Sequence, residues 1–159
     1  MIAPYILFAI DPGKTGAIAE FRAGALADFT PATAKWLGAM LQPAAFADLP
    51  RPVVLIEKVG GVPGQSAHRS FTFGRSVGEL VGVCLAFGIT PIEIPPQVWK
   101  GKLGLRRAEG MTQAQNKAQS LVLARSIWPE EAKAFARAKD DGKAEAALIG
   151  RYWLEENCK

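Results

Sequence analysis

Apolar and polar residues alternate along this chain in short apolar runs and longer amphipathic stretches. Five runs predict β-strands: residues 5–10, 15–21, 25–30, 52–57 and 90–94. Short glycine-containing links join the first three runs, and such links favour an antiparallel meander. The fourth run is nearly continuous and rich in β-branched residues, which is typical of a strand covered on both faces.

Apolar residues at helical spacing predict helices over four further stretches: residues 32–41, 71–87, 111–128 and 141–155. A glycine-rich loop precedes the second of these helices, and a polar, alanine-rich segment precedes the last. The order β-β-β-α-β-α-β-α-α predicts an α/β protein with a mixed sheet flanked by helices. We expect residues 1–159 to form a single domain.

The composition is that of a globular protein and not of a disordered one, because 49% of the 159 residues are hydrophobic and 21% are charged. Cys84 and Cys158 lie far apart and predict neither a metal site nor a disulfide framework. The apolar N-terminus lacks a basic flank, and Asp11 interrupts it too early for a membrane helix. We therefore expect a cytoplasmic protein without a membrane partner.

Positive charge is concentrated in one short segment. The formal net charge is +4, and the sequence WKGKLGLRR packs four cations into nine residues. These cations are Lys100, Lys102, Arg106 and Arg107. Such a run is commonly only a solvated face, but beside a phosphate-handling site it predicts contact with nucleic acid.

The stretch FAIDPGKTGAI ends an apolar strand on the carboxylate of Asp11. An ionised carboxylate at the mouth of a core loses hydration, so a cation or hydrogen-bond donors must replace the water. The backbone of the Asp-Pro-Gly turn, Lys14 and a metal ion are all candidates, and this stretch alone does not distinguish among them.

Three further acids favour a metal. The strand VVLIE ends on Glu57, and parallel neighbouring strands would bring Asp11 and Glu57 to the same sheet edge. Asp141 and Glu145 are four residues apart and share one helix face. Carboxylates that converge from two strands and a helix suit Mg²⁺ or Mn²⁺, which predicts metal-dependent phosphoryl chemistry. Asp140 is a candidate for helix capping.

In kind and order, these residues resemble the RuvC-type Holliday junction resolvases of the ribonuclease H-like nuclease superfamily, especially the phage-borne branch. FAIDPGKTGAI resembles the first-strand motif and VVLIEKV the fourth-strand acid. PPQVWKGKLGL resembles the Pro-x-x-Trp-Lys segment, Asn116-Lys117 the lysine-bearing helix, and DGKAEAALIG the acidic last helix. Together these segments span nearly the whole chain.

The resemblance implies a sheet of three antiparallel and two parallel strands, and a homodimer that cuts four-way junctions or other branched DNA in a bacterial or phage-infected cell. It implies that four acids ligate two Mg²⁺ ions, with Mn²⁺ as a substitute: Asp11, Glu57, Asp141 and Glu145. Lys117 would act in catalysis and Lys100 at the DNA backbone. Arg69 and Lys14 are further candidates for DNA contact, Lys14 with surface charge as its alternative. The predicted helix over residues 71–87 would supply either a dimer face or plain core.

Several alternatives stay open. The last-helix acids of cellular resolvases are commonly three apart with Asp second, whereas here the spacing is four and the second acid is Glu, so either Asp140 or Asp141 could be the ligand. DPGKTG is also similar to the phosphate loop of actin-like ATPases and sugar kinases. A junction-binding protein that no longer cuts, or a related nuclease acting on R-loops or flaps, would also fit.

Overall fold

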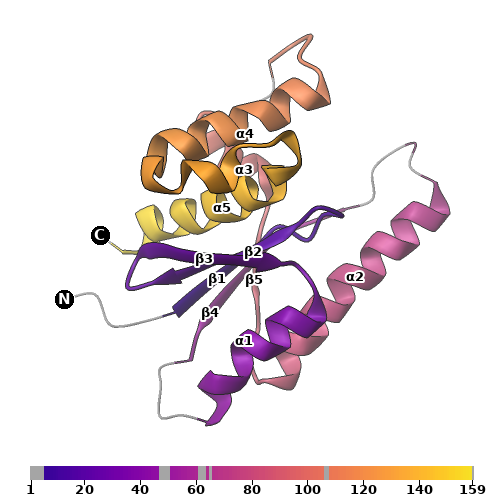
Figure 1. Cartoon of the computed structure of the whole chain (residues 1–159). Helices are drawn as coiled ribbons and strands as arrows, with labels where there is room; N and C mark the ends of the chain where they lie inside the picture. Colours follow the sequence, from indigo (N-terminus) through magenta and orange to yellow (C-terminus); the bar gives the residue numbers. More distant parts are fainter. Residues whose placement is uncertain (1–5, 47–50, 61–63, 65, 106–107, 159) are drawn as a thin grey trace.

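The computed structural model describes residues 6–46, 51–60, 64, 66–105 and 108–158. This part of the chain contains a five-stranded sheet in the order β3-β2-β1-β4-β5 (Figure 1). The strands are β1 (Ile6–Ile10), β2 (Ala17–Arg22), β3 (Ala25–Pro31), β4 (Val53–Glu57) and β5 (Ile92–Ile94). β1, β2 and β3 pair antiparallel, and β4 pairs parallel with both β1 and β5. The expected mixed sheet is confirmed.

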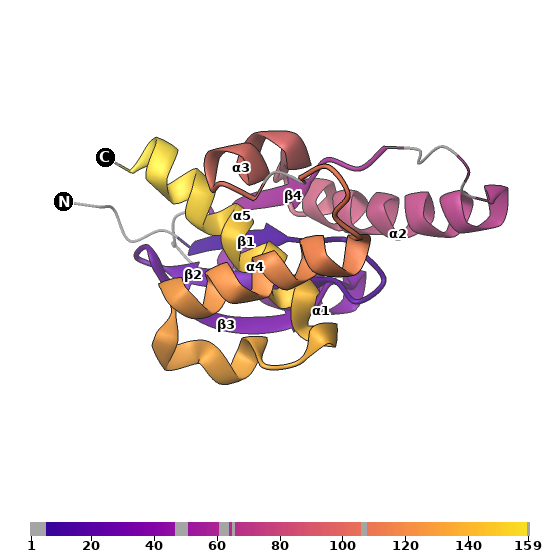
Figure 2. The ribbon, with the colours of Figure 1, turned by 90° about the horizontal axis from the view of Figure 1, so that it is seen from above.

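Helices cover both faces of this sheet. They are α1 (Ala34–Phe46), α2 (Ala67–Ala86), α3 (Pro96–Lys102), α4 (Gln113–Ile127) and α5 (Asp141–Asn157). α1 and α2 lie on one side of the sheet, and α3, α4 and α5 lie on the other (Figure 1). The first turns of α2 project beyond the sheet (Figure 2). None of the described helices is long and apolar enough to cross a membrane.

The alternation of side chains along β1 divides the core in two. Leu7 and Ala9 pack with α3, α4 and α5, whereas Phe8 and Ile10 pack with α1 and α2. All four side chains are almost completely buried. This double coverage explains why β1 and β4 are apolar at nearly every position until each reaches its terminal acid.

Two glycines let α5 lie directly on the sheet. A Cβ atom on Gly142 would stand 2.1 Å from the carbonyl oxygen of Thr15, and one on Gly150 would stand 2.3 Å from the Phe21 ring. These gaps are too short for any side chain, so glycine is required at both places. The close approach fixes the N-terminal end of α5 against the turn that follows β1.

The structure corrects several predicted boundaries. α2 begins at Ala67, where Ser66 caps it, so part of the predicted glycine-rich loop is helical. α1 continues past Pro43, and α3 begins at Pro96, within the Pro95-Pro96 pair that was expected only to stop a strand. Proline suits a first helical turn, because its missing N–H needs no partner there. The polar segment before α5 contains two 3₁₀ helices, Pro129–Phe135 and Ala138–Asp140.

Candidate active site

The parallel pairing of β1 with β4 brings the first two acids to one sheet edge. Ile10 pairs with Ile56, so Asp11, which follows β1, and Glu57, which ends β4, lie beside each other. Carboxyl ends of parallel strands are where open α/β sheets tend to build their sites. The predicted position of these two acids is therefore confirmed.

Asp11 is held in a desolvated position. Burial raises the pKa of its carboxyl to about 7 from 3.8, the hydrogen bond from the Gly13 backbone N–H opposes that rise, and repulsion by neighbouring carboxylates adds to it. These neighbours are Glu145, Glu57 and Asp141. The N–H of Gly13 donates to Asp11 Oδ1 over 3.0 Å. All four predicted acids are consequently close enough to interact electrostatically.

Glu57 has one fixed partner. The indole Nε1–H of the fully buried Trp99 donates to Glu57 Oε1 over 3.1 Å. Burial raises the pKa of Glu57 and so does the Glu145 carboxylate, whereas Lys100 and the Trp99 hydrogen bond lower it. The aromatic residue of the Pro-x-x-Trp-Lys segment thus packs inside the protein and holds a carboxylate.

The two acids of α5 are paired with lysines. Lys100 Nζ lies 3.0 Å from Glu145 Oε1 and 4.9 Å from the centroid of the Trp99 ring. Lys117, on α4, forms an ion pair with Asp141 Oδ2, and this hydrogen bond raises the pKa of the lysine. Lys100 and Lys117, both predicted from the sequence to belong to the site, therefore form ion pairs with two of the predicted acids.

Two hydroxyl groups complete the arrangement. Ser120 Oγ donates to Glu145 Oε1 over 3.2 Å, and Thr15 Oγ1 donates to Asp141 Oδ1 over 3.4 Å. Neither side chain was predicted from the sequence to belong to the site. Ser120 lies three residues after Lys117, hence on the same helix face, and that spacing was the available signal.

Asp140 and Asp141 have different environments. Asp140 accepts hydrogen bonds from the backbone and guanidinium of Arg137, and these contacts hold the pKa of its carboxyl below the ordinary value. Asp141 instead faces Lys117 and Thr15. Asp141 thus lies with the other three acids, whereas Asp140 is held by Arg137.

The donor chemistry of this cluster fits a hard divalent cation. Four carboxylates supply only oxygen ligands, which Mg²⁺ and Mn²⁺ prefer. As arranged, no three acidic, histidine or cysteine side chains among the described residues converge on one ion position. Each carboxylate is turned instead toward a protein donor, and two of those donors are ammonium groups, which neutralise the acids that a metal would otherwise bind.

The outer basic residues are spread more widely. Lys14 is exposed on the turn after β1, and Arg69 is exposed in the first turn of α2 and not in a loop. Lys102 is half exposed and forms a 2.9 Å ion pair with Glu156. Arg106 and Arg107 lie outside the described residues.

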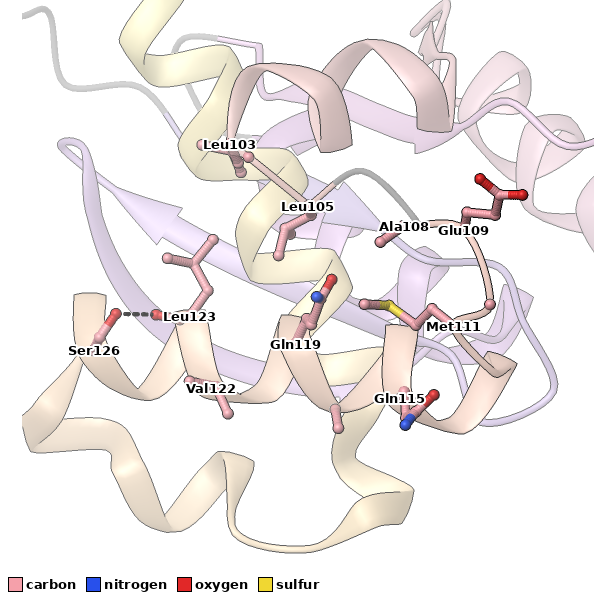
Figure 3. A pocket seen from close by; sticks show the side chains of 13 residues that line it. Leu103, Leu105, Ala108, Glu109, Met111, Gln115, Gln119, Val122, Leu123 and Ser126 are labelled. Carbon is pink, nitrogen blue, oxygen red and sulfur yellow. Dashed lines mark hydrogen bonds between the residues drawn. The ribbon is translucent and has the colours of Figure 1, made fainter.

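A separate groove of about 790 Å³ runs between α4 and the segment that follows α3 (Figure 3). Its described lining is largely apolar, with Leu105, Met111 and Val122 among its members, and includes none of the four acids. Gln119 points into it, and the amide oxygen of Gln119 is buried without a hydrogen-bond partner among the described residues. α4 therefore presents Lys117 and Ser120 to the acids and a different face to this groove.

Comparison with known sequences relates the chain to a junction resolvase. The chain is 33% identical over 124 residues, 73% of its length, to the chloroplastic Holliday junction resolvase MOC1 of Chlamydomonas reinhardtii. It spans about an eighth of that relative, since the match covers 13% of the longer protein. No protein-family model matches the chain.

Comparison with solved structures gives the fold. The chain matches Thermus thermophilus RuvC in complex with a Holliday junction substrate with a TM-score of 0.57 and 15% identity, over 96% of each chain. A second Thermus thermophilus RuvC structure matches with a TM-score of 0.53 and 16% identity, over 95% of this chain and 96% of the other. The chain has the ribonuclease H-like fold of RuvC, so the stated resemblance is confirmed for fold and sequence, while the phage-borne branch stays a prediction.

Proposed function

From the fold shared with RuvC and the sequence similarity to a junction resolvase, we propose that this chain is a metal-dependent endonuclease that resolves four-way DNA junctions. The observation that carries the proposal is the meeting of four carboxylates and two lysines at one sheet edge. Idle carboxylates would repel one another at a cost to stability. A role in metal-dependent phosphodiester hydrolysis would explain why the chain keeps these carboxylates together.

In this proposal Asp11, Glu57, Asp141 and Glu145 hold two Mg²⁺ ions, and Mn²⁺ can replace them. Metal bound there would lower the pKa of an attacking water and stabilise the leaving 3′ oxygen. The protein's own contribution is to fix the carboxylates on two strand ends and one helix. The buried surroundings of Asp11 also strengthen its attraction to any cation.

Lys100 and Lys117 change partners during the reaction. Each is paired with a carboxylate in the metal-free protein, and a divalent ion on that carboxylate would repel the ammonium group. The side chain of Lys117 is about half exposed, so it can turn toward the scissile phosphate. There it would neutralise the charge that develops in the transition state.

In this proposal six basic residues contact the phosphates of DNA. They are Lys14, Arg69, Lys100, Lys102, Arg106 and Arg107. Contacts of these cations with phosphates would give affinity that falls as salt rises, without selecting a base sequence. Selectivity for branched DNA would come from presenting two sites at once.

We propose a homodimer for that reason, with α2 as the contact surface. Only Leu80 and Cys84 are buried along this helix, whereas Phe71 and Leu85 are largely exposed. This exposure favours the dimer-face interpretation of α2 over plain core, because large apolar side chains left in water are typical of interfaces. Two copies would nick two strands of a junction symmetrically.

We also propose that the protein works in the reducing cytoplasm of a bacterial or phage-infected cell. Cys84, a buried residue of α2, is a free thiol in the core. Free cysteines suit a reducing compartment.

The decisive experiment compares synthetic four-way junctions, flaps, R-loops and matched duplex, each with and without Mg²⁺. Paired symmetric nicks in the junction alone support a resolvase. Cutting of flaps or R-loops instead supports the related nuclease, and junction binding without any cutting supports a protein that no longer cuts. Thermal stabilisation by ATP would favour the kinase-like alternative.

Variants separate chemistry from binding. Asp11→Asn and Glu145→Gln should abolish cutting while junction binding in Ca²⁺ is retained. Replacing Lys102, Arg106 and Arg107 together should weaken binding and reduce the slope of log affinity against log salt by up to about 3, because each cation that binds a phosphate adds about 1 to that slope. Normal cutting by either acid variant would remove that residue from the proposed ligand set.

A further inference from the structure

Each of the four acids accepts a hydrogen bond from an uncharged donor. The donor and acceptor pairs are Gly13 N–H to Asp11 Oδ1, Trp99 Nε1–H to Glu57 Oε1, Thr15 Oγ1 to Asp141 Oδ1, and Ser120 Oγ to Glu145 Oε1. Among the described residues, a lysine donates a hydrogen bond to one of these four acceptor oxygens, Oε1 of Glu145. Neutral donors and lysines therefore contact largely different carboxylate oxygens in this cluster.

Glu145 shows the difference most clearly, because Lys100 and Ser120 both donate to its Oε1 atom. A divalent ion near Glu145 repels the ammonium group of Lys100 but leaves the neutral hydroxyl of Ser120 unaffected. Of the two donors, only Ser120 can keep its bond when the site is charged. Oε1 would then stay tied to α4, and Oε2 would be the oxygen offered to the ion.

Ser120 is placed for this task by the helix packing. Its side chain is 1% exposed, and it lies on the face of α4 that meets α5. A buried hydroxyl requires a partner, and Glu145 is the partner found here. If the hydroxyl were only structural, its loss would lower the stability of the protein without changing its affinity for metal.

We propose that Ser120 is a positioning residue, whose hydroxyl holds Glu145 in the orientation that binds metal after Lys100 has left. This inference rests on the proposed metal-dependent function. It assigns Ser120 no contact with DNA or with the reacting phosphate. The residue acts through Glu145 alone.

The test is a titration of the whole chain, residues 1–159, with Mn²⁺ in the absence of DNA, and electron paramagnetic resonance measures the bound metal. Ser120→Ala should bind Mn²⁺ about tenfold more weakly than the unmodified protein, because partners that orient a metal ligand commonly change affinity by that order. Ser120→Cys, which keeps a weak donor, should lie between the two. The metal concentration needed for half-maximal cutting should rise in the same order.

Ser126→Ala is the matched control. Ser126 is an exposed serine on the same helix, and its hydroxyl donates to the Leu123 carbonyl. Its replacement should leave both Mn²⁺ affinity and cutting unchanged. Melting temperatures of all variants in EDTA report whether folding has suffered.

The outcomes are separable. Equal Mn²⁺ affinity for Ser120→Ala and the unmodified protein overturns the positioning role and leaves the proposed function standing. A fall in the metal-free melting temperature with unchanged Mn²⁺ affinity also overturns it, because that pattern marks a structural hydroxyl. An unmodified protein that neither binds Mn²⁺ nor cuts branched DNA overturns the proposed function itself.

Discussion

Replacing Asp11 by asparagine should stabilise the metal-free protein while abolishing its activity. Burial and three neighbouring carboxylates raise the pKa of Asp11 to about 7 from 3.8. A carboxyl with a raised pKa in the folded state leaves stability intact below pH 3.8, where it is protonated in both states. The folded state is then progressively penalised as the pH rises toward 7.

The size of the penalty follows from those two values. Each pH unit corresponds to about 1.4 kcal/mol, so the ionised carboxylate costs the folded state up to about 4 kcal/mol above pH 7. Asparagine has nearly the same shape, and its carbonyl oxygen can still accept from the Gly13 N–H. For a chain of this length, 1 kcal/mol corresponds to roughly 2–4 °C, so the gain in melting temperature is at most about 15 °C.

The assay is urea denaturation of both proteins in EDTA at pH 4 and pH 8. Asp11→Asn should have the higher free energy of unfolding at pH 8, and the difference should shrink at pH 4. Asp28→Asn, a change at an exposed position on β3, should show no such pH-dependent gain. Adding Mg²⁺ should stabilise the unmodified protein and leave Asp11→Asn almost unchanged.

A lower free energy of unfolding for Asp11→Asn at pH 8 would refute the electrostatic argument. So would a gain of equal size at both pH values, because only ionisation varies across that range. A variant that still gains stability from Mg²⁺ would show that Asp11 is not needed to hold metal.

Three other predictions concern the surroundings of the cluster. Asp140→Asn should lower the free energy of unfolding at pH 7 by roughly 1–3 kcal/mol, because the ion pair with Arg137 is lost. Urea denaturation at several pH values should show that this difference vanishes as the pH falls below the lowered pKa of Asp140. Gly142→Ala should lower the melting temperature severely, because its Cβ would stand 2.1 Å from a backbone oxygen, whereas Gly74→Ala in the exposed part of α2 should raise it slightly. Mn²⁺ affinity measured by calorimetry should rise by up to about tenfold per pH unit below pH 7 and level off above it, because the proton on Asp11 must leave before metal binds; a flat profile would contradict this.

The sheet and its acids could be predicted because each depends on local pattern. β1 and β4 are apolar on both faces and stop at a carboxylate, so their burial and their shared edge follow from the runs ending at Asp11 and Glu57. The helical spacing of Asp141 and Glu145 likewise fixes them on one face of α5. These parts of the site needed no knowledge of how the helices pack.

The donors of the cluster depend on packing and could not be predicted in the same way. α3 has only seven residues and begins at a proline pair, so its apolar pattern is too short to show a helix. Because α3 was not predicted, the sequence did not show which way the Trp99 indole points, and its hydrogen bond to Glu57 could not be predicted. Ser120 reaches Glu145 only because glycines bring α5 close to the sheet and α4 packs on α5.

The carboxylate repulsion and burial that destabilise the metal-free fold also increase its affinity for a cation. Lys100 and Lys117 form ion pairs with the two acids of α5, and these pairs stabilise the ionised acids in the metal-free protein. Asp11 has a backbone N–H as its hydrogen-bond donor, and its pKa is raised accordingly. A divalent ion therefore stabilises the ionised Asp11 carboxylate most, whereas the ion pairs of Asp141 and Glu145 with lysines must break before these acids bind metal. This ordering predicts that Asp11 contributes more to metal affinity than Glu145, and that the lysines become available for phosphate only after metal has entered.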